Sequence, residues 1–240
     1  PTEVNLTCPL DRNDKKSEPG YSALFQPHNR RATVLAAVPW FFQDLATYGI
    51  GIFTPTILAS AFGHISGHTR NVSGLILHDI LAAKGAALID TLLIVGIICA
   101  VILTDKIGRI RLQILGFIGC AVGLLLATIS LDVAGTTSTA LLFAGFMLFN
   151  FMTNIGPNAQ TYLLAGEVFP TKIRGRGAGS AAAFAKIAAV LTAVLFPILM
   201  ADIGTKALLY GLVATSLIGA AITYRFRIET TGVNLEKIGR

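Results

Sequence analysis

Long runs of apolar residues, separated by short polar stretches, fill the chain between residues 32 and 225. A helix needs about 20 consecutive apolar residues to cross a bilayer, and the runs have about that length or more. The pattern therefore predicts six transmembrane helices. They are expected at about 32–62, 86–104, 112–131, 139–166, 179–200 and 207–225. Residues 1–31 and 226–240 are polar, and they are interpreted as a linker or tail and as a closing tail.

Composition supports an all-α membrane protein. Hydrophobic residues make up 53% of the chain and charged residues 13%, whereas soluble domains carry about 25% charged residues. His64 and His68 have the i, i+4 spacing of helical metal ligands, but they fall in the predicted polar loop Gly63–Lys84 without a third ligand. We therefore predict no metal and no cofactor. The three cysteines suggest neither a disulfide framework nor a zinc site.

Positive charges are sorted between the two sides of the predicted bundle. Six spans place both termini on one side, and that side would hold fifteen of the nineteen Lys and Arg residues. Because cytoplasmic segments are rich in Lys and Arg, both termini are expected to be cytoplasmic in a plasma (inner) membrane. The net charge of +6 reflects this sorting. It indicates a lipid bilayer, and not nucleic acid, as the chain's surroundings.

An acid lies deep inside the first predicted span. Asp44 is twelve residues past Ala32, which corresponds to about 18 Å of helix within a bilayer core of about 30 Å. Trp40 and Tyr48 share its helix face because they are four residues away on either side. An acid at this depth is costly and points to function. A structural acid paired with a neighbouring helix is the alternative interpretation.

Two other polar features lie within spans. Lys186 in the fifth span either extends to the interface, attracts an anion, or pairs with an acid such as Asp44 or Asp90. Asp90 is expected to be interfacial. Gly156-Pro157 interrupts the fourth span, and we expect a break of the kind that exposes backbone groups to a transporter cavity.

Three polar segments carry a family resemblance. They read Asp105-Lys-Ile-Gly108-Arg109, Glu167-Val-Phe-Pro-Thr-Lys-Ile-Arg174 and Glu229-Thr-Thr-Gly-x-x-Leu-Glu236. In this order they resemble the loop between helices 8 and 9, the segment after helix 10, and the tail of the major facilitator superfamily. The resemblance implies the C-terminal six-helix half of that fold, with an N-terminal six-helix half as its partner. It also implies a cytoplasmic gating role for Asp105, Gly108, Arg109, Glu167 and Arg174.

One branch of the superfamily matches best. The segment from Asn150 to Tyr162 is similar to the G-P-N-x-T-T-F segment of phosphate:proton symporters, and W-x-x-x-D-x-x-x-Y in the first span matches their substrate-site helix. The Q-x-S-G-x-N and G-P-x-x-W patterns of sugar porters are absent. Gln160 departs from the family's usual Thr. By resemblance, the anion site is lined by Trp40, Asp44, Tyr48, Asn154, Asn158 and Tyr162, with Lys186 as a charge partner.

The expected activity is proton-coupled symport of a small anion such as inorganic phosphate by alternating access. Asp44 would carry the proton, since a protonated carboxyl donates a hydrogen bond to an oxyanion and an ionised one repels it. A sugar or organic metabolite:proton symporter is one alternative, and a non-transporting membrane interaction or sensor subunit is another. No nucleophile–base pair lies in the spans, so we do not predict an enzyme. The chain is expected to be a piece of something longer.

Overall fold

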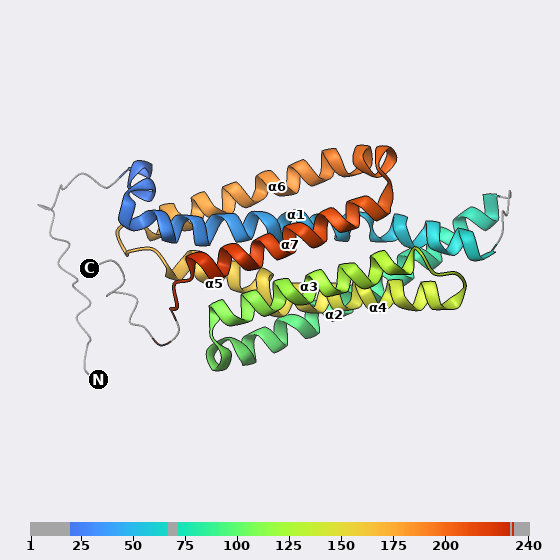
Figure 1. The fold of residues 1–240 in the computed structure, drawn as a ribbon, viewed down its shortest axis with the longest axis horizontal. Helices are drawn as coiled ribbons and strands as arrows, with labels where there is room; N and C mark the ends of the chain where they lie inside the picture. The colour runs from blue at the N-terminus through green and yellow to red at the C-terminus, as the bar shows by residue number, and fades with distance from the viewer. Residues whose placement is uncertain (1–19, 67–71, 231, 233–240) are drawn as a thin grey trace, which may run out of the picture.

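Helices account for all regular structure in the part of the chain that the computed structural model describes, namely residues 20–66, 72–230 and 232. Six long helical columns form one bundle (Figure 1). Their bounds are α1 Pro27–Ser66, α2 Val72–Ile107, α3 Arg109–Ser130, α4 Thr136–Thr153 continued by η2 Asn154–Asn158 and α5 Ala159–Glu167, α6 Arg174–Asp202, and α7 Gly204–Phe226. A short 3₁₀ helix, η1 Tyr21–Phe25, precedes α1.

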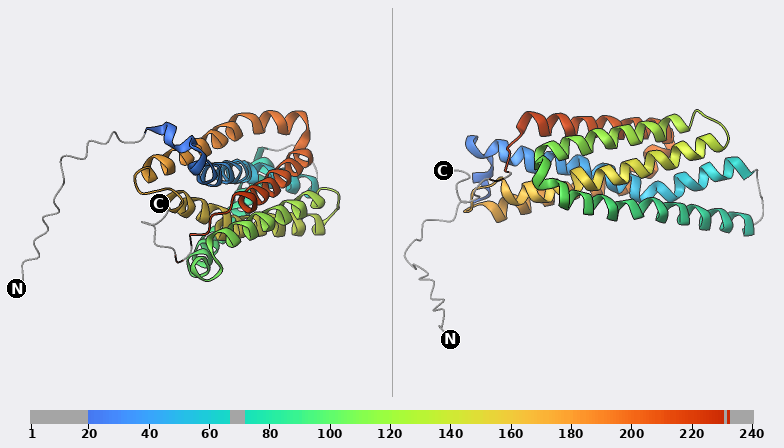
Figure 2. Two further views of the ribbon diagram at one scale, coloured as in Figure 1. Left: turned by 60° about the vertical axis from the view of Figure 1, so that its left-hand side comes forward. Right: turned by 90° about the horizontal axis from the view of Figure 1, so that it is seen from below.

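The columns run alternately up and down the bundle. The start of α1, the turn between α2 and α3, the link from α5 to α6 and the end of α7 lie at one end, which we call the terminal end (Figure 1, left; Figure 2). The turns from α3 to α4 and from α6 to α7 lie at the opposite end. This arrangement confirms the predicted fold class. It brings the first two motifs, and the start of the third at Glu229 and Thr230, to the terminal end.

Five of the helical columns are long and apolar enough to cross a membrane, α2 to α7 with α4, η2 and α5 counted as one. Their outer surfaces expose large apolar side chains, among them Val101, Val190 and Val194. Such surfaces are costly in water and suit lipid tails. The remaining column, α1, is 40 residues long and carries the polar pair Gln43 and Asp44 in its interior.

The link between the first two columns is shorter than the sequence predicted. The prediction of a polar loop at 63–84 is wrong in its bounds, because α1 continues to Ser66 and α2 begins at Val72. The stretch after Ser73 reads Gly-Leu-Ile-Leu, and isolated polar residues beyond it do not stop a helix whose neighbours are apolar. His68, half of the histidine pair considered as metal ligands, lies outside the described residues.

Helix α3 packs against the fourth column through glycines. A Cβ on Gly123 would lie 2.7 Å from the carbonyl oxygen of Gly145, and one on Gly116 would lie 2.6 Å from the Cα of Gly156. The two backbones therefore touch, which only small residues allow. The prediction of a break at Gly156-Pro157 is wrong. The chain stays helical there as a π-helical segment, η2, with both residues buried against α3.

A π-helical turn explains how Pro157 is tolerated inside a span. Proline has no backbone N–H to donate to the preceding turn, and its ring clashes with that turn in a regular α-helix. The wider i→i+5 turn of η2 removes the clash. The turn also sets the direction in which Asn154 and Asn158 project from the column. The π-helical turn that accommodates Pro157 therefore also positions the side chains of Asn154 and Asn158.

Two hydrophobic clusters divide the interior along α1. One cluster contains Trp40 and lies towards the terminal end, where it includes Phe169. The other begins at Ala46 and Ile50 and continues through α3, α4 and α7. Asp44 lies between them on α1. The packing on both sides holds the polar segment of α1 at a fixed height in the bundle.

Candidate functional site: an ion pair and a polar ladder in the bundle interior

Asp44 and Lys186 form a salt bridge between α1 and α6. Lys186 Nζ is 2.8 Å from Asp44 Oδ2 and donates a second hydrogen bond to the hydroxyl of Tyr48 at 3.2 Å. The Asp44 side chain is 4% exposed and that of Lys186 49%. Lys186 therefore does not extend to the interface as one interpretation held. It pairs with Asp44, and the Lys186 side chain is the more exposed member of the pair.

Asp44 and Lys186 both lie several turns inside their helices. Asp44 is seventeen residues after Pro27 at the start of α1, and Lys186 is twelve residues after Arg174 at the start of α6. At about 1.5 Å per residue, both are well inside a bilayer core of about 30 Å. A salt bridge at that depth, with one member buried, is costly to form and is kept for a reason other than stability alone.

Aromatic residues lie one turn towards the terminal end. The rings of Trp40 and Tyr162 are 4.5 Å apart in an edge-to-face arrangement, so the first and fourth columns meet through these predicted site residues. The indole N–H of Trp40 is buried near the Asp44 carboxylate, yet it makes no well-aligned hydrogen bond to any residue that the structure describes. A buried N–H donor that lacks a well-aligned partner is costly, and a ligand oxygen would satisfy it.

A ladder of amides connects α1 to the fourth column. Gln43 Nε2 donates to Asn158 Oδ1 at 3.3 Å and to Thr47 Oγ1 at 3.0 Å. Asn158 Nδ2 then donates to Asn154 Oδ1 at 2.8 Å. The structure thus brings Asn154 and Asn158 next to the segment of α1 that carries Asp44. The sequence analysis missed Gln43, although its position beside Asp44 in an apolar run was a signal.

The ladder leads towards a second intramembrane acid. Asn154 donates to the carbonyl oxygen of Asn150 at 3.3 Å, and the side chain of Asn150 donates to Asp90 Oδ1 at 3.1 Å. The expectation that Asp90 is interfacial is wrong, because α2 begins at Val72 and runs to Ile107. Asp90 is seventeen residues before Ile107, which is about 26 Å of helix. Asp44 lies at the same distance from the start of α1.

Gln160 does not join this ladder. It is fully buried and donates to Thr104 Oγ1 on α2 at 2.8 Å. Its amide therefore fills space between the fourth column and α2, away from Asp44. At this departure from the family pattern, the side chain of Gln160 therefore contacts α2 and not the salt bridge.

The predicted gating residues gather at the terminal end. Arg109 forms a fork with Glu167, with Nε at 3.1 Å and Nη2 at 3.3 Å from its two carboxylate oxygens, and binds Asp105 at 2.9 Å. Gly108 has a φ of 95°, a conformation that favours glycine and lets α2 turn into α3. Thr230, from the tail motif, donates a hydrogen bond to Glu167.

Arg174 belongs to the same end of the bundle. Its Nε donates to the carbonyl oxygen of Phe169 at 3.2 Å, so it closes the link between α5 and α6. A direct pair between Glu167 and Arg174 stays a prediction. The conformational role of these residues is likewise a prediction, to which the proposed function returns.

The bundle, with its apolar outer surfaces and its ion pair, defines a helical membrane protein. The family model described as "Sugar (and other) transporter" matches residues 9–240. The chain therefore belongs to that family of the major facilitator superfamily, as the three motifs predicted.

Relatives and a solved structure agree with this membership. The chain is 31% identical over 182 residues to a putative inorganic phosphate transporter of Schizosaccharomyces pombe, covering 75% of this chain and 30% of that protein. It is 27% identical over 188 residues to the glycerophosphoinositol transporter 1 of Saccharomyces cerevisiae, and the match covers 78% of this chain and 34% of that protein. A double Trp mutant of XylE has a similar fold, with a TM-score of 0.66 and 21% identity over 87% of this chain and 42% of that one. The chain spans less than half the length of these relatives.

Proposed function

We propose that this chain forms the C-terminal half of a proton-coupled symporter for a phosphate-type anion. The observation that carries the proposal is the Asp44–Lys186 salt bridge, in which a buried acid holds an accessible ammonium group inside the bundle. The names of its relatives supply the substrate class. The chain spans less than half of their length, so the transport cycle is proposed for the full-length protein that contains it.

Proton and anion would bind to opposite members of this salt bridge, the proton to Asp44 and the anion to Lys186. A proton on Asp44 removes the negative charge that holds Lys186, and the ammonium group becomes free to bind an oxyanion. An anion on Lys186 in turn weakens its attraction for Asp44 and favours the protonated acid. Each ligand then strengthens the binding of the other by the same factor. This positive coupling is what a symporter requires.

The neighbouring groups supply donors suited to an oxyanion. Trp40 has a buried N–H without a well-aligned partner, and Tyr48 and Tyr162 have phenolic O–H groups that lie on partly exposed side chains. The amide ladder through Asn154 and Asn158 fixes the fourth column against α1. Donors that are already in place lower the cost of binding a charged ligand.

The terminal-end residues would bias the two states of the cycle. The fork between Arg109 and Glu167 ties α3 to α5, and Thr230 extends it to the tail. In alternating access one half moves largely as a unit against the other. We place this end in the cytoplasm of a plasma membrane, following the charge sorting. The fork between Arg109 and Glu167 would stabilise the state in which the N-terminal half closes against the terminal end.

The test compares Asp44→Asn with a matched Asp202→Asn control in the full-length protein. Asp202 ends α6 and is exposed, so it loses the same charge without touching the salt bridge. Uptake of labelled phosphate into vesicles is measured with and without an imposed pH gradient. We expect Asp44→Asn to abolish gradient-driven accumulation, because no group remains at the site to take up and release the proton.

Counterflow exchange separates coupling from folding. Because asparagine keeps hydrogen-bond donors, Asp44→Asn should still exchange external for internal phosphate, and its exchange should depend less on pH than that of the control. Accumulation that follows the pH gradient in Asp44→Asn would refute the coupling role. Exchange that fails with every phosphate compound, while the protein is folded in vesicles, would refute the anion site itself.

A phosphate ester of a polyol is the second candidate substrate. The glycerophosphoinositol transporter among the relatives and the amide ladder, which offers donors and acceptors for hydroxyl groups, favour it. Competition decides between the candidates. Glycerophosphoinositol and a simple sugar are each added to the phosphate exchange assay, and the compound that competes at the lowest concentration identifies the class.

A further inference from the structure

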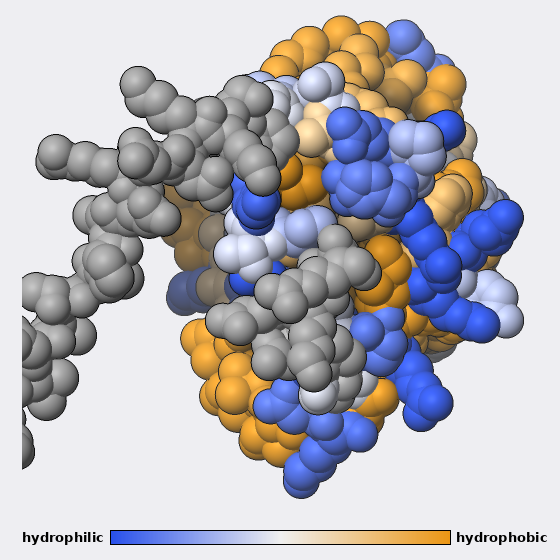
Figure 3. Space-filling view, turned by 90° about the vertical axis from the view of Figure 1, so that its left-hand side faces the viewer, coloured by the Kyte–Doolittle hydropathy of each residue, from blue (hydrophilic) through white to orange (hydrophobic). Residues whose placement is uncertain are grey.

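A pocket at the terminal end collects three arginines. It has a volume of about 350 Å³ and is lined by Pro27, Arg30, Arg31, Arg225 and Phe226. Hydrophilic side chains gather over this end of the molecule, while apolar side chains cover its flanks (Figure 3). The pocket lies between the start of α1 and the end of α7. Its lining residue nearest to Asp44 along α1 is Arg31, at about 20 Å of helix, so the pocket is separate from the site of transport.

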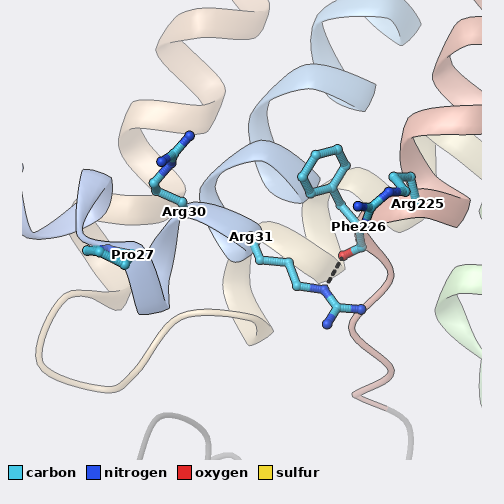
Figure 4. Close-up of a pocket in the computed structure, with 5 residues that line it drawn as sticks. All are labelled: Pro27, Arg30, Arg31, Arg225 and Phe226. Atoms are coloured by element: carbon cyan, nitrogen blue, oxygen red, sulfur yellow. Dashed lines mark hydrogen bonds between the residues drawn. The ribbon is translucent and has the colours of Figure 1, made fainter.

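The three arginines surround the pocket from two helices. Arg30 at the start of α1 and Arg225 at the end of α7 lie on opposite sides of Arg31, which reaches across to α7 (Figure 4). Arg31 donates to the carbonyl oxygens of Phe226 at 3.4 Å and Arg227 at 2.6 Å. These bonds use two of the five N–H donors of a guanidinium group, and they hold Arg31 in place for a ligand.

Among the described residues, none supplies a negative charge to balance the arginines of the pocket. No acidic residue lines it within the described part of the chain. Arg30 has no side-chain partner among the described residues, and Arg225 contacts only the ring of Phe226, with 5.6 Å between its Cζ and the ring centre. Arg30 lies in the first turn of α1 and Arg31 directly follows it, and that turn has no acid. Cations are unfavourable there because the helix dipole is positive at that end.

We propose that this pocket binds a phosphate group, carried either by an anionic phospholipid headgroup of the cytoplasmic leaflet or by free inorganic phosphate. Arginine matches the geometry of phosphate through paired N–H donors. Basic pockets between helices on the cytoplasmic side suit phosphorylated lipid headgroups. Three guanidinium groups around 350 Å³ leave room for a phosphate with bridging waters. The bound anion would also tie α1 to α7 and so stabilise this end of the bundle.

The test uses the double variant Arg30→Gln/Arg225→Gln, which leaves Arg31 and its backbone contacts intact. Its matched control is Lys106→Gln/Lys172→Gln. Both lysines are exposed and lie outside the pocket, and the control loses the same total charge from the same end of the bundle. A comparison of the two variants therefore removes the general effect of basic residues on topology and on attraction to an anionic surface.

Two arms distinguish the sources of phosphate. In the lipid arm, the full-length protein is placed in phosphatidylcholine nanodiscs with and without a polyphosphoinositide, and lipid binding is measured together with the shift in melting temperature. In the soluble arm, inorganic phosphate is titrated in phosphatidylcholine nanodiscs, with sodium chloride at equal ionic strength as reference. The soluble arm is run on a Lys186→Gln background to remove binding at the transport site.

The ligand should raise the melting temperature of wild type and control. Arg30→Gln/Arg225→Gln should lose that shift and bind at least about tenfold more weakly, since losing charge-assisted hydrogen bonds costs a decade or more in affinity. A difference in the lipid arm assigns a headgroup, one in the soluble arm assigns inorganic phosphate, and one in both assigns a site for either. Equal binding by the double variant and the control in both arms overturns the proposal.

The charge-conserving variant Arg30→Lys/Arg225→Lys keeps the test decisive if the glutamine variant does not fold. Lysine retains the charge and loses the paired donors. Weaker binding by this folded variant supports recognition of a phosphate group, and unchanged binding overturns it. The melting temperature in phosphatidylcholine alone reports folding, because neither ligand is present there.

Discussion

Breaking the Asp44–Lys186 salt bridge from either side should have unequal effects on stability. Lys186→Gln leaves the Asp44 side chain, which is 4% exposed, without its cation. Asp44→Asn leaves Lys186, which is 49% exposed, and that ammonium group can be hydrated where it stands. The unpaired charge is therefore buried in the first variant and half-solvated in the second.

The magnitudes follow from that difference in exposure. Removing one partner of a buried pair costs about 3–5 kcal/mol. Because the lysine is half exposed, we expect Lys186→Gln to cost about 3 kcal/mol, at the lower end of that range. The loss from Asp44→Asn should be about 1 kcal/mol, as for a single net hydrogen bond. For a domain of about 150–250 residues, 1 kcal/mol shifts the melting temperature by about 2–4 °C. The expected decreases are thus about 6–12 °C and about 2–4 °C.

The assay is thermal unfolding in one detergent at neutral pH, for wild type, both single variants and the double variant. The double variant should be more stable than the sum of the single losses predicts, because neither charge remains unpaired. The reasoning is refuted if Asp44→Asn costs as much as Lys186→Gln. Additive losses in the double variant would show that the two side chains do not interact.

Three further predictions address packing, gating and the second acid. Gly116→Ala should lower the unfolding free energy by about 1–3 kcal/mol through overpacking, since the new Cβ would meet backbone atoms, whereas Gly211→Ala, which meets no atom within 4 Å, should not lower the melting temperature. Arg109→Gln removes the fork with Glu167 and should change the inward–outward balance in a cysteine-accessibility assay, and an unchanged balance would exclude gating. Asp90→Asn keeps a polar partner for its amide neighbour, so gradient-driven uptake should persist, and its loss would make this acid part of the coupling.

Apolar periodicity and charge sorting predicted the number of helical columns and the end at which the motifs meet. The depth of Asp44 could also be predicted, because it depends only on distance along one helix. The choice of Asp44 over Asp90 as the partner of Lys186 could not. Both acids lie about 26 Å from a helix end, and only the packing of α6 against α1 decides between them.

Local sequence rules failed where the tertiary packing satisfied the backbone in another way. Gly156-Pro157 is a signal for a break, yet η2 absorbs the proline and Gly116 accepts its close approach. The beginning of α2 was missed because its first turns mix polar and apolar residues. Gln43 was missed because its role depends on Asn158, which is far away in the sequence.

The contacts at the terminal end explain how the C-terminal half could move against the N-terminal half without rearranging its own site. Arg109 joins α3 to α5 through Glu167, and Arg31 joins α1 to the end of α7. These links, with the glycine contacts between α3 and the fourth column, favour motion of the half as one body. The helices that carry Asp44 and Lys186 would then keep their positions through the cycle, while the salt bridge itself opens when Asp44 is protonated. Proton and anion would control each other by charge neutralisation within the pair, while access to it changes as the body moves.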